Sequence, residues 1–189
     1  RGAKAGLAKG IIVPDAAYPI VSYDLLRTQQ VETALILALT RQESEMNPHA
    51  HSYAGAYGLM QFMPRTASQQ ARLEGLPYRR SWLTDDPAYN MTLGDAHLDD
   101  LLDRFNGSYI MTAAAYNAGA SRPAKWIQEY GDPRRGEIDP IDWVEFIPFS
   151  ETRNYVQRVL ENVQVYRQRT GDEDEAIRLS DDLARVRMR

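Results

Sequence analysis

The 189-residue sequence predicts a mainly α-helical domain with at most a minor β element. Apolar residues recur at helical spacing along almost the whole chain, whereas runs of alternating β-branched residues are scarce. Hydrophobic residues make up 43% and charged residues 25%, which is typical of a globular protein and too apolar for a disordered one. The length corresponds to about one domain with a sizeable core.

The composition excludes several classes of protein and site. The chain has no cysteine, which excludes a disulfide scaffold, a cysteine nucleophile and a thiolate metal site. Its net charge of −4 lacks the basic excess of a non-specific nucleic-acid binder, so we expect no nucleic-acid partner. The longest apolar run, Ala34 to Leu39, is too short for a membrane span. The three histidines lack a completing carboxylate, so we expect no metal and no cofactor.

The first strong helix is expected from about residue 29 to residue 46. It is apolar nearly all round, which is typical of a buried helix, and Pro48 ends it. A polar loop covers residues 49–56. A short helical stretch is then expected at 59–62, and a further helix follows Pro64.

The middle of the chain carries clear helix boundaries. Asp85-Asp86-Pro87 is typical of a helix start, and Asn106-Gly107 closes that helix. Residues 109–118 form an Ala-rich apolar helix with Gly119 as its C-terminal cap. A short helix follows, which Ser121 begins as a cap and a glycine ends.

The last third predicts one short and one long helix. A helical turn is expected over residues 141–146, before Pro148. Ser150 is expected to be the N-cap of the long helix. Its apolar face consists of Tyr155, Val156, Val159, Leu160, Val163 and Tyr166.

Glu43 is the acidic residue with the most informative position. Ile36 and Leu39 precede it by seven and four residues and lie on the same helix face. A carboxyl on an apolar face loses hydration, which raises its pKa and suits it to donate a proton. The alternative is a solvent-exposed helix-end glutamate near Arg41. Glu45 points about 200° away around the helix and is expected to be a surface charge.

Four separated segments carry a family resemblance. They are Arg41–Pro48, Gly55–Ala67, Ala114–Gly119 and Ile147–Val156. Together they resemble the soluble, Slt-type lytic transglycosylases, and more narrowly the C-terminal catalytic domain of the large periplasmic members. Any one segment alone would be weak, since Ala-Tyr-Asn-Ala-Gly also suits an ordinary capped helix.

The resemblance implies a lysozyme-like helical domain of the goose-type and transglycosylase kind, acting on peptidoglycan glycan strands in the periplasm. It implies cleavage of the β-1,4 bond between N-acetylmuramic acid and N-acetylglucosamine, with closure of a 1,6-anhydro ring. By motif, Glu43 matches the single catalytic acid, which acts first as acid and then as base. In the family, the acetamido group of the substrate is thought to stabilise the cationic centre between these steps.

The resemblance also assigns substrate contacts. The residues are Ser52, Gln61, Met63, Tyr116, Asn117, Glu151 and Tyr155. Ser52 and Gln61 are expected to contact the sugar acetamido group or to hold the cleft wall, and the Tyr116 hydroxyl to hydrogen-bond the catalytic acid. Glu151 either lines the cleft or is a first-turn glutamate that interacts with the helix dipole. Tyr155 either lines the cleft or packs in the core.

Two features stand outside this assignment. Tyr57 occupies a position of Gly-Ala-x-Gly that is often small or polar in the family, which we expect to alter one subsite without affecting the acid. Trp82, Trp126 and Trp143 have rings that suit sugar stacking, but core packing is the favoured interpretation.

The expected organisation has three parts. Residues 1–22 are a lead-in from an upstream helical domain of the same parent chain, 23–170 the catalytic domain and 171–189 a helical tail. The acidic run 172–175 is expected to be a solvated helix start, and the start at Arg1 indicates a mature form or a fragment. Two other functions stay open. One is a hydrolytic muramidase of goose-lysozyme type with Glu151 as second carboxylate, and the other a non-catalytic glycan-binding module.

Overall fold

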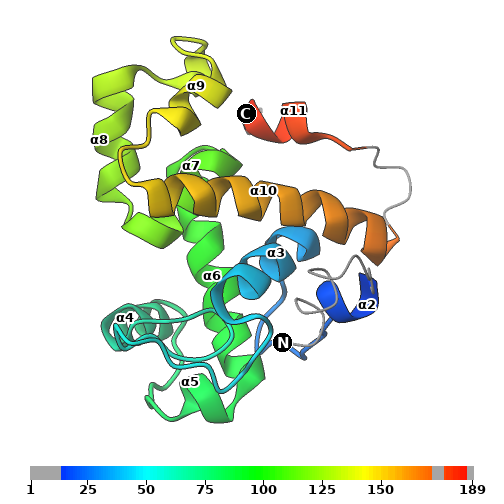
Figure 1. Cartoon of the computed structure of the whole chain (residues 1–189). Coiled ribbons are helices and arrows are strands. Elements are labelled where there is room, and N and C mark those ends of the chain that lie inside the picture. The colour runs from blue at the N-terminus through cyan, green and yellow to red at the C-terminus, as the bar shows by residue number, and fades with distance from the viewer. Residues whose placement is uncertain (1–13, 172–176, 187–189) are drawn as a thin grey trace.

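The structure, a computed structural model, describes residues 14–171 and 177–186, and this part of the chain is helical (Figure 1). Its elements are α2 (Pro14–Ala17), α3 (Thr33–Ser44), α4 (Pro64–Leu73), α5 (Trp82–Asp85), α6 (Pro87–Arg104), α7 (Tyr109–Ala118), α8 (Ser121–Tyr130), the 3-10 helix η1 (Pro133–Arg135), α9 (Pro140–Glu145), α10 (Ser150–Thr170) and α11 (Leu179–Leu183). Within the described residues, the β structure consists of two isolated bridges, between His51 and Tyr57 and between Tyr57 and Phe62. The predicted fold class is therefore confirmed.

Helix α3 is the buried centre of the molecule and packs along α10, which also contacts α7 (Figure 1). Residues 34–40 of α3 are all buried, as expected for a helix that is apolar on every side. The helix begins at Thr33, later than expected, and ends at Ser44. Glu45 and Met46 then adopt left-handed backbone angles, with φ of 52° and 63°, which stops the helix.

Two of the expected N-caps differ from the structure. The helix start predicted at Asp85-Asp86-Pro87 is confirmed, and the Asp86 side chain caps α6 by accepting a hydrogen bond from the Tyr89 amide at 3.0 Å. Ser121 and Ser150, in contrast, are the first helical residues of α8 and α10, and neither helix has a side-chain cap. The prediction of serine caps is wrong at both positions, although both helices form.

The short helix expected at residues 59–62 is also wrong. The chain instead makes a turn that brings Tyr57 and Phe62 together, with reciprocal backbone hydrogen bonds of 3.0 Å. Gly58 and Gln61 have φ angles of 79° and 48°, which a right-handed helix does not contain.

Asn90, in α6, holds this turn in place. Its side chain is fully buried and accepts a hydrogen bond from the Met60 amide at 2.9 Å. It donates to the Tyr57 and Leu83 carbonyl oxygens at 3.1 and 2.9 Å. The turn runs so close to Leu83 that a Cβ on Gly58 would lie 1.9 Å from the Leu83 carbonyl oxygen. Glycine is therefore required there on steric grounds as well as for its backbone angle.

Both ends of the described chain pack on the central helices. Arg41 of α3 donates to the Ala17 carbonyl at 2.8 Å and lies 4.0 Å over the Tyr18 ring. At the other end, Arg167 of α10 makes two hydrogen bonds to Asp182 of α11, at 2.6 and 3.0 Å. The acidic run 172–175 lies outside the described residues.

Two further expectations concern apolar residues. Trp126 and Trp143 are buried in the core, as favoured from the sequence, and Trp82 is half-buried. No helix in the described residues is both long and apolar enough to cross a membrane.

Candidate active site

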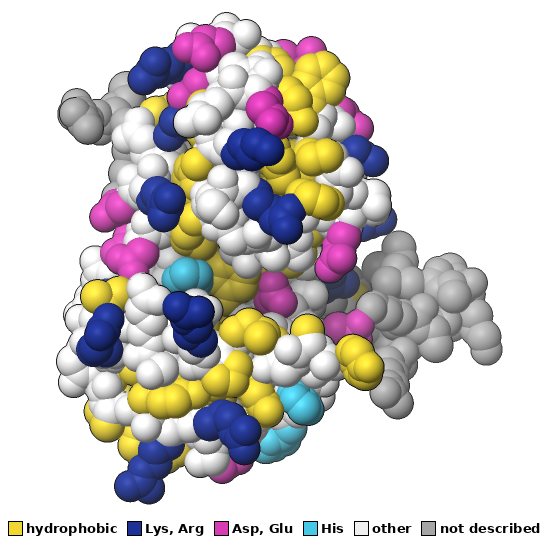
Figure 2. Space-filling model, turned by 90° about the vertical axis from the view of Figure 1, so that its left-hand side faces the viewer, with side chains coloured by type: hydrophobic (Ala, Val, Ile, Leu, Met, Phe, Trp, Pro, Cys, Tyr) yellow, Lys and Arg dark blue, Asp and Glu magenta, His cyan; other side chains and the backbone are white. Residues whose placement is uncertain are grey.

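A hollow separates two parts of the molecule on the face where α4 and α8 lie. Figure 2 shows it running across this face, with an acidic side chain inside it. We call residues 45–86 below it, with α4 and α5, the lower lobe. Residues 119–155 above it, with α8, α9 and the start of α10, are the upper lobe (Figures 1 and 2).

Glu43 lies in the last turn of α3 and is half-buried. The hydroxyl of the buried Tyr155, in α10, donates a hydrogen bond of 2.5 Å to Glu43 Oε1. Burial raises the pKa of Glu43 to about 7, the bond from Tyr155 lowers it in part, and the negative charge of Glu151 raises it further. The increase expected from the sequence is confirmed. A carboxyl with this pKa holds a proton in a large fraction of molecules at neutral pH.

Tyr116 does not make the hydrogen bond that the resemblance assigns to it. Its hydroxyl donates instead to the Met60 carbonyl at 2.7 Å, and it is Tyr155 that bonds Glu43. Tyr116 is still close, because the charge of Glu43 adds to burial in raising its pKa far above the usual value. Tyr116 and Tyr155 both lie near Glu43. The residue type alone does not tell which of the two hydroxyl groups forms the hydrogen bond with the acid.

Glu151 and Asn117 lie where α10 begins. Glu151 is exposed in the first turn of α10, close enough to affect the pKa of Glu43 through its charge. Asn117, at the end of α7, accepts a hydrogen bond of 2.7 Å from the hydroxyl of buried Thr152. This bond ties the α7 end that carries Tyr116 to the α10 start. In this arrangement Asn117 supports the site through its bond to Thr152.

The loop before α4 forms the lower side of the site. The Ser52 hydroxyl accepts a hydrogen bond from the Ala56 amide at 2.9 Å and so closes the loop on itself. The Gln61 side-chain amide donates to the Gly58 carbonyl at 2.8 Å, which makes Gln61 a support of the turn. Met63 is the N-cap of α4 and is 45% exposed, so its thioether is available for apolar contact.

His97, in α6, is a site neighbour that the sequence did not single out as functional. Its ring lies between Phe62 and Tyr116, with centroid distances of 5.9 and 5.5 Å. Burial lowers the pKa of His97, which favours the neutral imidazole. In the sequence, His97 stands at helical spacing from apolar residues, as a histidine packed in the core would. The sequence therefore does not indicate that His97 lies beside the site.

The arrangement suits proton transfer by one half-buried carboxyl. Glu43 provides a proton near neutral pH, and a neutral phenol fixes one of its oxygen atoms. In the described part of the chain, no group of three or more His, Cys, Asp or Glu side chains is placed to hold a metal ion.

Comparisons with protein families and curated proteins agree with this geometry. The transglycosylase SLT domain family matches residues 24–138, and the soluble lytic transglycosylase helical domain matches residues 146–174. The soluble lytic murein transglycosylase of Escherichia coli (strain K12) is 36% identical over 160 residues, which are 82% of this chain and 24% of that protein. A membrane-bound lytic murein transglycosylase C of Glaesserella parasuis is 33% identical over 156 residues, covering 72% of this chain and 42% of that protein.

Solved structures show the same fold. The 70-kDa soluble lytic transglycosylase of Escherichia coli in complex with bulgecin A has a TM-score of 0.83 at 32% identity, covering 97% of this chain and 30% of that one. An inactive mutant of the lytic transglycosylase Slt from Pseudomonas aeruginosa has a TM-score of 0.67 at 38% identity, covering 74% and 22%. The lysozyme-like helical fold of transglycosylase type is therefore confirmed. The chain spans about a quarter of the length of its soluble relatives.

Proposed function

This chain belongs to the transglycosylase SLT domain family, and we propose that it is a lytic transglycosylase of peptidoglycan. The reaction is cleavage of the β-1,4 bond between N-acetylmuramic acid and N-acetylglucosamine, with formation of 1,6-anhydromuramic acid. One observation carries the proposal: Glu43 has a pKa of about 7 and accepts a hydrogen bond from Tyr155. We propose the periplasm as its location, as the resemblance to soluble lytic murein transglycosylases implies.

The proposed reaction returns the enzyme to its starting protonation state. Protonated Glu43 donates its proton to the glycosidic oxygen as the bond from that oxygen to C1 of the muramyl residue breaks. The Glu43 carboxylate then takes the proton of the muramyl C6 hydroxyl as O6 bonds to C1. The hydrogen bond from Tyr155 to Oε1 leaves Oε2 as the atom that exchanges the proton in both steps.

The remaining site residues support binding in this scheme. We assign substrate contacts to the Ser52 hydroxyl and to the thioether of Met63, whose side chain is 45% exposed. Gln61, Tyr116 and Asn117 hold the surrounding backbone in place through the bonds described above. We assign Glu151 an electrostatic role, because its charge favours the protonated form of Glu43 before substrate is cleaved.

A hydrolytic muramidase is the second candidate, and the charge of Glu151 beside Glu43 is the observation that favours it. Glycosidases that hydrolyse their substrate generally use two carboxyl groups, one of which activates water or attacks the sugar. In that case the product would end in a reducing muramic acid.

Mass spectrometry of muropeptides released from purified sacculi tests the proposal. We expect the parent protein to release products one water lighter than the reducing sugar, with no incorporation of ¹⁸O from labelled water. Glu43→Gln should bind sacculi and release nothing. Reducing, ¹⁸O-labelled products would establish the muramidase instead. Undiminished release by Glu43→Gln would refute the role of Glu43, and binding without release by both proteins would indicate a glycan-binding module.

A further inference from the structure

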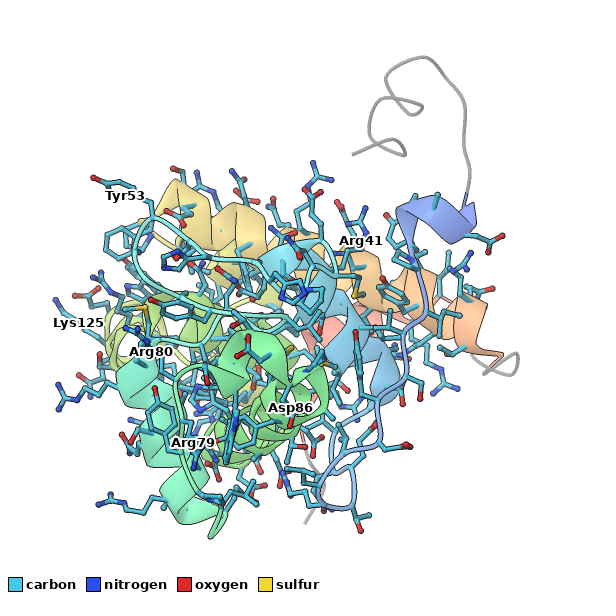
Figure 3. All side chains as sticks on the ribbon, turned by 90° about the horizontal axis from the view of Figure 1, so that it is seen from below. Arg41, Tyr53, Arg79, Arg80, Asp86 and Lys125 are labelled. Atoms are coloured by element: carbon cyan, nitrogen blue, oxygen red, sulfur yellow. The ribbon has the colours of Figure 1, made fainter. Side chains whose placement is uncertain are left out.

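Arg41 lies two residues before Glu43 and contacts two elements outside α3. Its Nε donates a hydrogen bond to the Ala17 carbonyl at 2.8 Å, and its Nη1 donates to Asn162 Oδ1 in α10 at 3.1 Å. The guanidinium also lies 4.0 Å from the centroid of the Tyr18 ring, within the range of a cation–π contact. Figure 3 shows the side chain directed from α3 toward α2. This half-buried arginine is therefore fixed by three different groups.

Helix α10 meets the end of α3 through two pairs of side chains. Tyr155 and Asn162 are seven residues apart in α10, so they lie on one face of this helix, about 10 Å apart along its axis. Tyr155 bonds Glu43, and Asn162 bonds Arg41. Within α3, Arg41 and Glu43 are two residues apart, which places them about 200° apart around the helix. The two hydrogen bonds therefore hold the end of α3 on opposite flanks.

The place of Glu43 near a helix end makes a second contact necessary. Helix α3 ends at Ser44, and Glu45 and Met46 after it have left-handed backbone angles. The last turn of a helix lacks part of its internal backbone hydrogen bonds, and helix ends fray. The bond from Tyr155 alone would still let this turn rotate about the helix axis. A second bond on the opposite flank prevents that rotation.

The N-terminal segment that contacts Arg41 is itself packed on α10. The Tyr18 ring makes an edge contact with the fully buried ring of Tyr166, with centroids 5.7 Å apart. The Tyr166 hydroxyl donates a hydrogen bond to the Pro19 carbonyl at 3.2 Å. The Ala17 carbonyl and the Tyr18 ring are thus held against α10, which also provides the second hydrogen-bond acceptor of Arg41.

We propose that Arg41 is a positioning residue for Glu43. It holds the last turn of α3 at the rotation at which the Tyr155 hydroxyl reaches the Glu43 carboxyl, and the N-terminal segment holds Arg41 in turn. A planar guanidinium suits this role, because its rigid fork donates to two acceptors in fixed directions. The consequence for the reaction rests on the proposed function, in which Glu43 exchanges the proton. The contact itself belongs to the folded protein, so it is measured without substrate.

The test follows the titration of Glu43 by ¹³C NMR of protein labelled at the carboxyl carbon of the glutamate side chains. Glu43→Gln identifies the Glu43 signal by its disappearance. Asn162→Leu removes the acceptor in α10 without a change of charge, and Arg41→Lys keeps the charge but not the planar fork. The matched control is Arg134→Lys, which alters a half-buried pair with Asp132, of 2.7 Å, in the upper lobe. Circular dichroism and thermal unfolding verify that each protein is folded.

We expect the midpoint of the Glu43 titration to rise in Asn162→Leu and in Arg41→Lys. A loosened turn weakens the bond from Tyr155, and this bond favours the charged form of Glu43. Loss of the whole bond corresponds to roughly one to two pH units, so partial loss should give a rise of about 0.3–1 unit. Tyr18→Ala should give a smaller rise, and Arg134→Lys none.

The same substitutions in a Tyr155→Phe background show whether Arg41 acts through Tyr155. There the further rise should disappear, because the bond is already absent, whereas a direct effect of charge would persist. An unchanged midpoint in Asn162→Leu or Arg41→Lys would overturn the proposal. So would a rise of equal size in both backgrounds, or in Arg134→Lys. Release of muropeptides is assayed separately: no release by the parent protein would refute the proposed function, and the NMR titration would still decide the role of Arg41.

Discussion

Tyr155→Phe should move the pH dependence of the reaction toward alkaline pH. The substitution keeps the buried ring and removes the hydroxyl that donates 2.5 Å to Glu43 Oε1. A hydrogen bond to a charged group contributes about 1.5–3 kcal/mol, and one pKa unit corresponds to about 1.4 kcal/mol. Loss of the bond destabilises the carboxylate more than the protonated form. The pKa of Glu43 should therefore rise from about 7 by about one to two units.

The assay is the pH profile of kcat/KM for release of anhydromuropeptides. The alkaline limb reports the loss of the proton from Glu43 in the free enzyme, so its midpoint should move upward by the same amount. The maximal rate should fall, because the carboxyl is no longer fixed by its partner. Tyr116→Phe is the matched control: its hydroxyl bonds the Met60 carbonyl, so the midpoint should stay in place.

A downward shift or an unchanged midpoint in Tyr155→Phe would refute the assignment of this hydrogen bond to the pKa of Glu43. If Tyr116→Phe moved the midpoint and Tyr155→Phe did not, the role implied by family resemblance would be right and the geometry wrong. The two variants therefore distinguish the roles of Tyr155 and Tyr116 by the midpoint of the pH profile, which a merely structural effect does not change.

Two further predictions concern stability. The raised pKa of Glu43 means that its contribution to stability is fully present below pH 4.5 and is lost as the pH rises through 7. Glu43→Gln should therefore be more stable than the parent by about 3 kcal/mol at pH 8.5 and nearly equal to it at pH 4.5, in urea unfolding; a constant difference at both pH values would contradict this. Arg167→Met removes the cationic partner that bonds both Glu32 and the buried Asp182 and leaves Asp182, among the described residues, only the longer cationic contact of 3.8 Å with Arg185, so it should cost about 3–5 kcal/mol in the same assay. Arg158→Gln, which breaks an exposed pair, should cost less than about 1 kcal/mol, and equal costs for the two would show that burial of the Arg167 network does not matter.

The parts of the fold that the sequence predicts are those with local signals. Residues 109–118 form α7 with the expected bounds, because an apolar run and the following Gly119 define both the helix and its end. The buried character of α3 follows from apolar residues on all its sides. In each case the residues that determine the helix are neighbours in the sequence, so a short stretch of sequence is enough to predict it.

The parts that differ depend on contacts between distant residues. The composition of residues 59–62 favours a helix, but the chain forms a turn there. The side chain of Asn90, about 30 residues away, makes hydrogen bonds with backbone groups that a helix would pair internally. Likewise, Tyr116 and Tyr155 approach Glu43 from different helices, and helix packing decides which hydroxyl reaches the acid. The spacing of residues within one helix therefore cannot predict which tyrosine bonds Glu43.

The pKa of Glu43 bears on why one carboxyl is enough. In the proposed scheme the same group is an acid in the first step and a base in the second, so a pKa close to the working pH serves both steps. An ordinary glutamate with a pKa of 4.5 would be protonated in only about 0.3% of molecules at pH 7, whereas Glu43 is protonated in about half. Burial and the charge of Glu151 raise the pKa, and the bond from Tyr155 limits the rise. A higher value could at most double the protonated fraction at pH 7, while it would slow the release of the proton to the glycosidic oxygen. The opposing effects thus hold one carboxyl at a pKa where both proton transfers remain accessible.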